Sequence, residues 1–281
     1  MRRIVWVVVC GILVFDLNLS TEAAVTEEAQ TPSMTTNATT SENSPFSMYY
    51  YAAFYGPALQ NPSSYQPTQT GQNDFNHPVI MKNFLGLGFN LSDTIAITPT
   101  AYWIWTPVQG QQVALQDPFL QISDSSLVST DHFNLYCDLR YHFPVTSVSQ
   151  QNRSYGGVQS FQSATYQIGT SRFSLGSYAS ERVNFYGLSG YGNDLELYVA
   201  PNATYQVSRN VALTLLYEMR TAHFNGDDPF AFSSDPFDLE PGLSWEVTPT
   251  LMLNPYVNLY PTGNLSLKSS SIGMLFSWQL M

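Results

Sequence analysis

The eleven residues from Ser271 to Met281 alternate between two kinds of side chain, and this alternation most constrains the fold. The even positions are large and apolar: Ile272, Met274, Phe276, Trp278 and Leu280. The odd positions are mostly small or polar. Because successive residues of a strand point to opposite sides, the segment is predicted to be a β-strand with one aromatic-rich apolar face.

The first residues have the pattern of a secretory signal. A basic start at Met1-Arg2-Arg3 precedes an apolar run of about a dozen residues, which is too short to span a membrane. We expect residues 1–24 to be removed. Residues 25–45 are rich in Thr, Ser, Glu and Asn and are expected to form a disordered periplasmic leader. The folded domain is therefore predicted to be 46–281, and any membrane insertion there must use strands.

The composition excludes several classes of protein. Only 11% of residues are charged while 14% are aromatic, whereas a soluble domain carries about 25% charged residues. The net charge of -11 argues against nucleic acid as a partner. After signal removal Cys137 is the one remaining cysteine, which excludes an intramolecular disulfide and any cysteine-based metal site.

Twelve strands are predicted downstream of the leader, and the connections between them alternate in length. Ser92-Asp93 and Thr248-Pro249 exemplify the tight turns, while 59–78, 108–116, 145–159, 187–193, 225–235 and 261–269 are longer loops. The predicted strands are 47–58, 79–91, 94–107, 117–127, 131–144, 160–169, 172–186, 194–206, 210–224, 236–247, 250–260 and 270–281. Ten or fourteen strands would also fit the pattern.

The alternating terminal strand, the signal and the short and long connections together resemble bacterial outer-membrane β-barrels. The resemblance implies an all-β fold, a transmembrane up-and-down antiparallel β-barrel of about twelve strands in the outer membrane of a Gram-negative bacterium. It also implies contact with outer-membrane lipid and with the barrel insertion machinery. Phe276, Trp278 and Leu280 would form the assembly signal that this machinery reads.

Side chains alternate between the two faces of a strand, and this parity predicts which of them face lipid. The outward aromatic residues fall into two belts. One lies near the short turns: Phe89, Phe133, Phe173, Tyr205, Trp245 and Trp278. The other lies towards the long loops: Trp103, Trp105, Tyr141, Phe143, Phe185 and Tyr217. Phe133 to Phe143 spans roughly 33 Å of strand, or about 25 Å of height when tilted, which matches the apolar band of such barrels.

Four prolines fit this pattern badly. Pro99, Pro201, Pro241 and Pro255 fall within predicted strands on the outward face, where each removes a ladder donor. We expect β-bulges to accommodate them. Asn83 would face inward only if its strand were locally bulged, because Lys82 precedes it.

The residues that alternate with the lipid-facing ones point inward, and they predict a charged lumen. The candidate residues of a solute path are Lys82, Asp138, Arg140, His142, Arg172, Arg182, Glu196, Glu218, Arg220, Asp238, Glu240 and Glu246. Glu181 is the main outward exception, and we expect it near a strand end. The lumen charges could simply pair across strands, as Glu218 and Arg220 could with Asp238 and Glu240. Alternatively they could form a constriction with a transverse field that selects a solute.

Catalytic and metal sites are not predicted. A lipid hydrolase barrel would need a Ser activated by His on the outward rim, but His132 and His142 face the lumen by parity. His223 with Asp227 and Asp228 could suit a protease, although a solvated loop is the simpler interpretation. No Cys/His cluster, Asp-x-Asp loop or phosphate-binding loop is present in the sequence, so no metal or cofactor is expected.

The sequence therefore favours a passive channel for small polar solutes. A structural or surface-adhesion barrel with a plugged lumen is the alternative, because the loops 57–78 and 225–236 would suit a surface contact. An outer-membrane hydrolase is the third possibility. The solute and the oligomeric state are not determined by the sequence.

Overall fold

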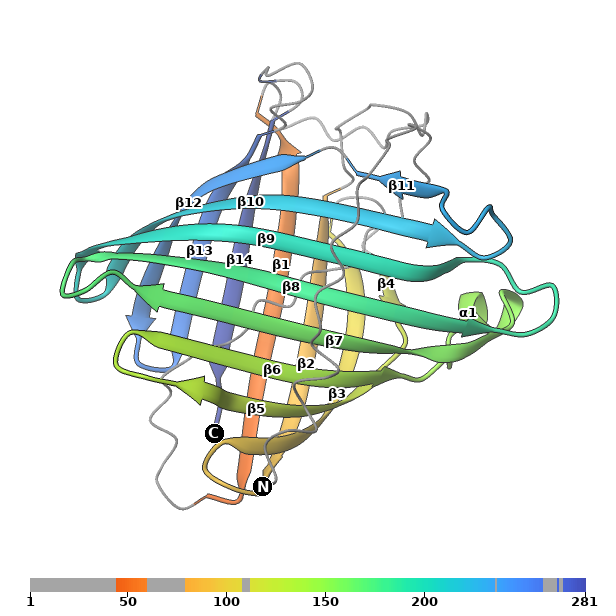
Figure 1. The fold of residues 1–281 in the computed structure, drawn as a ribbon, viewed down its shortest axis with the longest axis horizontal. Helices are drawn as coiled ribbons and strands as arrows, with labels where there is room; N and C mark the ends of the chain where they lie inside the picture. The colour runs from red at the N-terminus through yellow and green to blue at the C-terminus, as the bar shows by residue number, and fades with distance from the viewer. Residues whose placement is uncertain (1–43, 60–78, 108–111, 236, 260–266, 268–269) are drawn as a thin grey trace.

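The computed structural model describes residues 44–59, 79–107, 112–235, 237–259, 267 and 270–281 (Figure 1). The expected signal, residues 1–24, and most of the expected leader, 25–45, lie outside these residues. Most of the expected loops 59–78 and 261–269 lies outside them as well. In the described part of the chain there is no helix that is long and apolar enough to cross a membrane.

β-Strands account for nearly all regular structure in the described residues. The strands are β1 (Phe46–Ala58), β2 (Ile80–Asn90), β3 (Ile95–Thr106), β4 (Gln112–Leu115), β5 (Phe119–Ser129), β6 (Phe133–His142), β7 (Ser154–Gln167), β8 (Phe173–Tyr186), β9 (Asn193–Ser208), β10 (Val211–Phe224), β11 (Phe232–Ser234), β12 (Asp238–Thr248), β13 (Leu251–Asn258) and β14 (Ser271–Gln279). A short helix, α1 (Ser147–Gln151), precedes β7.

Twelve of these strands form a closed antiparallel ring. The hydrogen-bonded order is β1-β2-β3-β5-β6-β7-β8-β9-β10-β12-β13-β14, and β14 pairs with β1 to close it. The short strands β4 and β11 lie outside the ring and pair with β3 and β10. In Figure 1 the strands β5 to β10 cross in front of the steeper β14, β1 and β2, as expected when a tilted sheet closes on itself. The predicted all-β barrel fold is confirmed.

The predicted loops contain more regular structure than expected. The expected loop 145–159 contains α1 and the first six residues of β7, which begins at Ser154. Gly157 lies within β7, where a Cβ atom would come within 2.3 Å of Asn184 Oδ1. The glycine therefore permits close packing between β7 and β8 instead of ending the strand. The expected loops 108–116 and 225–235 contain β4 and β11.

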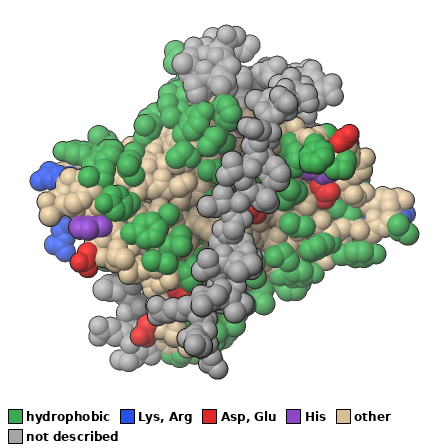
Figure 2. Space-filling model, viewed as in Figure 1, with side chains coloured by type: hydrophobic (Ala, Val, Ile, Leu, Met, Phe, Trp, Pro, Cys, Tyr) green, Lys and Arg blue, Asp and Glu red, His purple; other side chains and the backbone are tan. Residues whose placement is uncertain are grey.

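The two faces of the wall follow the predicted parity. On β6 the inward residues Tyr136, Asp138, Arg140 and His142 are buried, while Tyr141 is exposed on the outer face. Figure 2 shows apolar side chains spread over the outer surface, with Arg and His at its rim. On β14 the even residues, including Phe276 and Trp278, also lie on the outer side.

Two polar residues differ from expectation, Asn83 in its facing and Glu181 in its position along the strand. Asn83 does not face inward, because the β1–β2 register passes through it without a bulge. It lies on the outer face, where Tyr50 Oη donates to its Oδ1 over 2.6 Å and its Nδ2 donates to the Met81 carbonyl. Glu181 does face outward but is not near a strand end. It lies within β8 and pairs with Ser160 and Leu197, in the middle of the wall.

The four prolines are not accommodated by bulges. The β2–β3 ladder is interrupted beside Pro99, the β9–β10 ladder beside Pro201, and the β12–β13 ladder around Pro241 and Pro255. The register is the same on both sides of each interruption, so no extra residue is inserted. The missing N–H donors therefore fall at gaps in one ladder, while the other neighbouring strand stays paired.

The barrel interior has an aromatic core beside β1, β2, β3 and β5. Its buried members are Tyr51, Ala53, Phe84 and Phe119, against which Tyr49, Tyr55, Tyr102 and Leu275 pack. The rings of Phe84 and Tyr102 stack at 4.4 Å between centroids. Such rings contribute most of the apolar burial inside the barrel. The charged inward side chains are positioned around this core.

Candidate functional site

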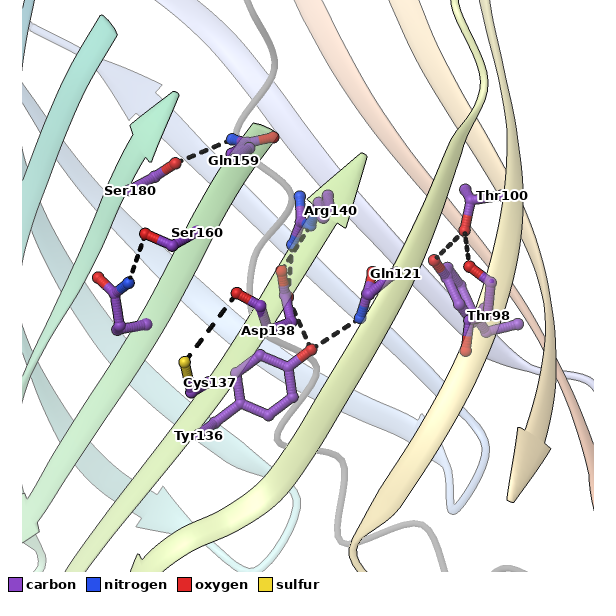
Figure 3. A network of polar contacts seen from close by, with 12 residues as sticks. Thr98, Thr100, Gln121, Tyr136, Cys137, Asp138, Arg140, Gln159, Ser160 and Ser180 are labelled. Carbon is purple, nitrogen blue, oxygen red and sulfur yellow. Dashed lines mark hydrogen bonds and ion pairs between the residues drawn. The ribbon is translucent and has the colours of Figure 1, made fainter. Parts of the chain in front are cut away.

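The best-defined polar site lies on β5 and β6, and we call Gln121, Tyr136, Asp138 and Arg140 the β6 network (Figure 3). Arg140 donates to both carboxylate oxygens of Asp138, from Nε over 2.8 Å and from Nη2 over 2.7 Å. Tyr136 Oη donates to Asp138 Oδ2 over 2.8 Å, and Gln121 Nε2 donates to Tyr136 Oη over 2.9 Å. The fork of two parallel bonds holds the guanidinium in one orientation.

Aromatic rings enclose this ion pair. The Arg140 guanidinium lies 5.4 Å from the ring centroid of Phe119 and 5.2 Å from that of Phe161. Asp138 is 2% exposed and Arg140 is 4% exposed. Charges taken so far out of water need a partner and a full set of hydrogen bonds, and this pair has both. The β6 network is therefore rigid and well satisfied.

A second group of charges lies on β10 and β12. We call Glu218, Asp238 and Glu240 the carboxylate cluster; its oxygens converge within 4.8 Å of one another. Arg220 Nη2 lies 3.5 Å from Glu218 Oε2. This pairing differs from the prediction that Glu218 and Arg220 would pair with Asp238 and Glu240. The register places Glu218 directly opposite Asp238, so carboxylate faces carboxylate, and Arg220 lies beyond the last β10–β12 pair.

Other predicted residues extend the polar lining. Arg182 Nε donates to Asn184 Oδ1 over 2.7 Å, and Asn184 Nδ2 donates to Glu196 over 3.0 Å. His142 Nε2 is 2.9 Å from Gln159 Oε1. The ammonium group of Lys82, which is 0% exposed, lies 5.0 Å from the ring centroid of Tyr55.

Two predicted residues are not brought to this interior. Arg172 precedes β8 in a short turn, where its guanidinium donates to the carbonyl of Val207. Glu246 is exposed near the end of β12, next to the turn at 249–250. Both lie at the end of the barrel that carries the short turns, so they are rim residues.

The strand order sets the two polar groups across the interior from each other. Five ring strands separate β6 from β13 in either direction: β7, β8, β9, β10 and β12 on one side, and β5, β3, β2, β1 and β14 on the other. The β6 network therefore lies opposite β13, which is adjacent to the carboxylate cluster on β12. This arrangement places a neutralised ion pair against a wall with excess negative charge.

Sequence reasoning did not identify the aromatic side chains that narrow the interior. Tyr51, Phe84, Phe119 and Phe161 are buried inward residues, and Tyr51 is among the most completely buried side chains. Parity would have found Phe84, because it shares the inward face of β2 with Lys82. Tyr51, Phe119 and Phe161 were not predicted to face inward, because aromatic residues of such barrels are expected to face lipid.

The histidine at the long-loop end does not have the geometry of a general base. His223 Nδ1 lies 2.6 Å from Asp194 Oδ1, and its Nε2 lies 2.9 Å from the carbonyl oxygen of Asp228. The carboxylate partner is thus Asp194, and neither Asp227 nor the Asp228 side chain takes that place. A general base needs a free nitrogen to accept a proton from the nucleophile, and both ring nitrogens here face acceptor oxygens.

Comparison with solved structures shows a shared fold. An outer-membrane channel from Pseudomonas putida F1 superposes with a TM-score of 0.51 and 10% sequence identity, over 84% of this chain and 94% of that chain. The NanC porin gives a TM-score of 0.45 and 9% identity, over 82% of this chain and 97% of that one. No protein-family model and no curated protein matches the sequence. The fold is that of an outer-membrane β-barrel.

Proposed function

We propose that this barrel is a passive channel for small polar solutes in the bacterial outer membrane. The fold that it shares with an outer-membrane channel supports a barrel inserted in lipid. Twelve strands lie between eight-stranded barrels, which side chains fill, and wide sixteen-stranded porins. A ring of twelve strands leaves room for a narrow path only, and small solutes are the class of molecule that fits such a path.

The arrangement of charges across the interior carries this proposal. Arg140 and Asp138 project from β6, and the carboxylate cluster projects from β10 and β12 on the other side. The excess negative charge on the β10 and β12 side faces a neutralised ion pair on β6, and this asymmetry creates a transverse field, which orients a polar solute as it passes. The excess of carboxylates favours solutes that carry positive charge. Lys82, His142, Arg182, Glu196 and Arg220 extend this lining, and Arg172 and Glu246 would act at the rim.

One observation favours the alternative, a structural or surface-adhesion barrel with a plugged lumen. Tyr51, Lys82 and Asp138 are almost completely buried, and the aromatic core occupies the interior beside β1 to β5. Side chains packed in this way could close the barrel. A hydrolase has no comparable support, because the ring nitrogens of His223 are both engaged.

Single-channel conductance of the refolded protein in a planar bilayer distinguishes these functions. We expect small, discrete conductance steps with a preference for cations. Tyr51→Ala should enlarge the steps, because it removes a buried ring from the aromatic core inside the barrel, and Asp238→Asn should reduce the cation preference. Phe173→Ala, on the outer face, is the matched control and should leave conductance unchanged. Silent bilayers with both the wild type and Tyr51→Ala would favour the plugged barrel.

A further inference from the structure

The carboxylate cluster brings three acidic side chains to one point of the interior wall. Glu218 on β10 is paired directly with Asp238 on β12, and Glu240 follows two residues later on the same face. Their oxygens lie within 4.8 Å of one another. Glu218 is 4% exposed and Glu240 is 7% exposed. Like charges at this separation repel strongly when water is excluded. The three carboxylates therefore need cations or hydrogen-bond donors that offset their negative charge.

Within the described residues, the cations and hydrogen-bond donors around the carboxylate cluster do not offset all of its negative charge. Glu218 accepts a hydrogen bond from Tyr198 Oη over 3.0 Å and pairs with Arg220. Asp238 Oδ2 accepts from Asn258 Nδ2 over 3.3 Å, while its Oδ1 is buried without a hydrogen bond. Glu240 has no hydrogen bond or ion pair with any described residue. Arg220 and Lys82, which also interacts electrostatically with Glu218, thus face three carboxylates. Asp238 Oδ1 and the Glu240 carboxylate remain without a hydrogen-bond donor among the described residues.

Asn258 supplies a separate indication of a ligand. It lies on β13, is 6% exposed, and carries a buried Oδ1 that has no hydrogen-bond partner. The bond from Nδ2 to Asp238 holds the amide against the cluster, and a half-turn of the amide brings Oδ1 to the place that Nδ2 occupies. A buried amide oxygen left unpaired costs free energy unless a donor or a cation meets it. Asn258 itself carries no charge, so the repulsion among the acids does not explain its orphan oxygen.

We propose that Glu218, Asp238, Glu240 and Asn258 form a binding site for a divalent cation, with Ca²⁺ as the best fit. All the available ligand atoms are oxygens, which hard cations prefer. Ca²⁺ binds oxygens at about 2.4 Å, so two ligands on opposite sides of the ion lie about 4.8 Å apart. Bidentate carboxylates and one amide oxygen supply the six to eight ligands that Ca²⁺ takes in irregular geometry. Zn²⁺ is disfavoured because the site holds no His or Cys.

A divalent cation would also balance the local charge. The three carboxylates outnumber the two cations that act on them, Arg220 and Lys82, and a bound Ca²⁺ offsets the remaining negative charge. The cation would join β10, β12 and β13 where the β12–β13 ladder is interrupted around Pro241 and Pro255. The site would thus stabilise the wall whether or not the barrel conducts solutes.

The test uses the full refolded barrel in detergent, stripped with EDTA and titrated with Tb³⁺ as a luminescent substitute for Ca²⁺. Tyr198 donates to Glu218 and can sensitise the bound ion. We expect tyrosine-sensitised emission that Ca²⁺ displaces, and a higher thermal unfolding temperature in Ca²⁺ than in EDTA. Glu240→Gln should weaken binding at least about tenfold, since weaker second-sphere changes already cost that much.

Two further variants keep the test decisive. Glu196→Gln removes an interior carboxylate outside the cluster and should bind Tb³⁺ as the wild type does. Asn258→Asp adds a ligand charge and should tighten binding even if Glu240→Gln folds poorly. The proposal is overturned if no emission is found, or if Glu240→Gln and Asn258→Asp both bind as the wild type does. A stability that depends on pH but not on Ca²⁺ would mean that the acids share protons, and this also overturns it.

Discussion

At the scale of single residues, Glu181 occupies the least favourable position in the wall. It faces outward in the middle of β8, opposite Ser160 on β7 and Leu197 on β9. Ser160 Oγ and Gln162 Nε2 both donate to its Oε2, and Gln162 also donates to Ser160 Oγ over 2.9 Å. These bonds reduce the cost of the carboxylate but do not remove it, because an acidic group facing hydrocarbon loses its hydration.

Glu181→Leu should therefore stabilise the barrel. We expect the free energy of unfolding in urea to rise by less than about 2 kcal/mol, since acidic residues on the lipid face cost less than Lys or Arg. Ser160 and Gln162 keep the bond between them. Glu196→Leu is the matched control, and it should destabilise because Asn184 loses one of its two acceptors and Arg182 loses a carboxylate partner inside the barrel. If the control stabilised the barrel and Glu181→Leu did not, the assigned facing of β8 and β9 would be reversed.

At the scale of strands, the prolines show how the wall tolerates a missing donor. Each one lies beside an interrupted ladder and keeps its pairing on the other side, as Pro99 does with Leu120. A proline placed where both ladders are continuous has no such gap. Leu139 is such a position, because it pairs with Ile122 on β5 and with Ser160 on β7.

Leu139→Pro and Pro99→Val should consequently differ in outcome. Leu139→Pro removes a hydrogen bond in a region without water, where an unsatisfied backbone group costs several kcal/mol. We expect this variant to lose the shift in SDS gel mobility between unheated and boiled samples. Pro99→Val should retain that shift. Equal behaviour of the two variants would contradict the explanation by ladder gaps.

The strand scale also shows what the sequence could predict. Period-two alternation and short turns located all twelve ring strands, because each wall residue has one face in lipid and one inside. The pattern missed β4, β11 and the start of β7, since these segments lie outside the belt or carry glycines. The convergence of Glu218, Asp238 and Asn258 depends on the register among β10, β12 and β13. The sequence placed Glu218 and Arg220 near Asp238 and Glu240, but parity cannot supply the register, so the direct opposition of Glu218 and Asp238 appeared only in the structure.

At the scale of the whole molecule, the interior combines an aromatic core with charged networks. The core residues come from β1, β2, β3 and β5, and the charged networks of β6, β10 and β12 lie among further buried rings such as Phe161 and Tyr256. The closed ring holds both, because no ring strand has an unpaired neighbour. The aromatic core and the charged networks therefore both depend on the ring staying closed.

Closure depends on β14, which pairs with β1 on one side and β13 on the other. Deleting Phe276 to Met281 removes all four pairs that join Tyr49–Ala52 to β14 and leaves two open edges in lipid. Each unpaired backbone group there costs several kcal/mol, far more than any loop contact offsets. We expect the truncated protein to be degraded before it reaches the outer membrane. Deletion of 226–234 removes β11, which lies outside the ring, and should leave insertion intact. Fractionation followed by unheated and boiled gel lanes measures both, and heat-modifiable truncated protein in the outer membrane would contradict the role of β14.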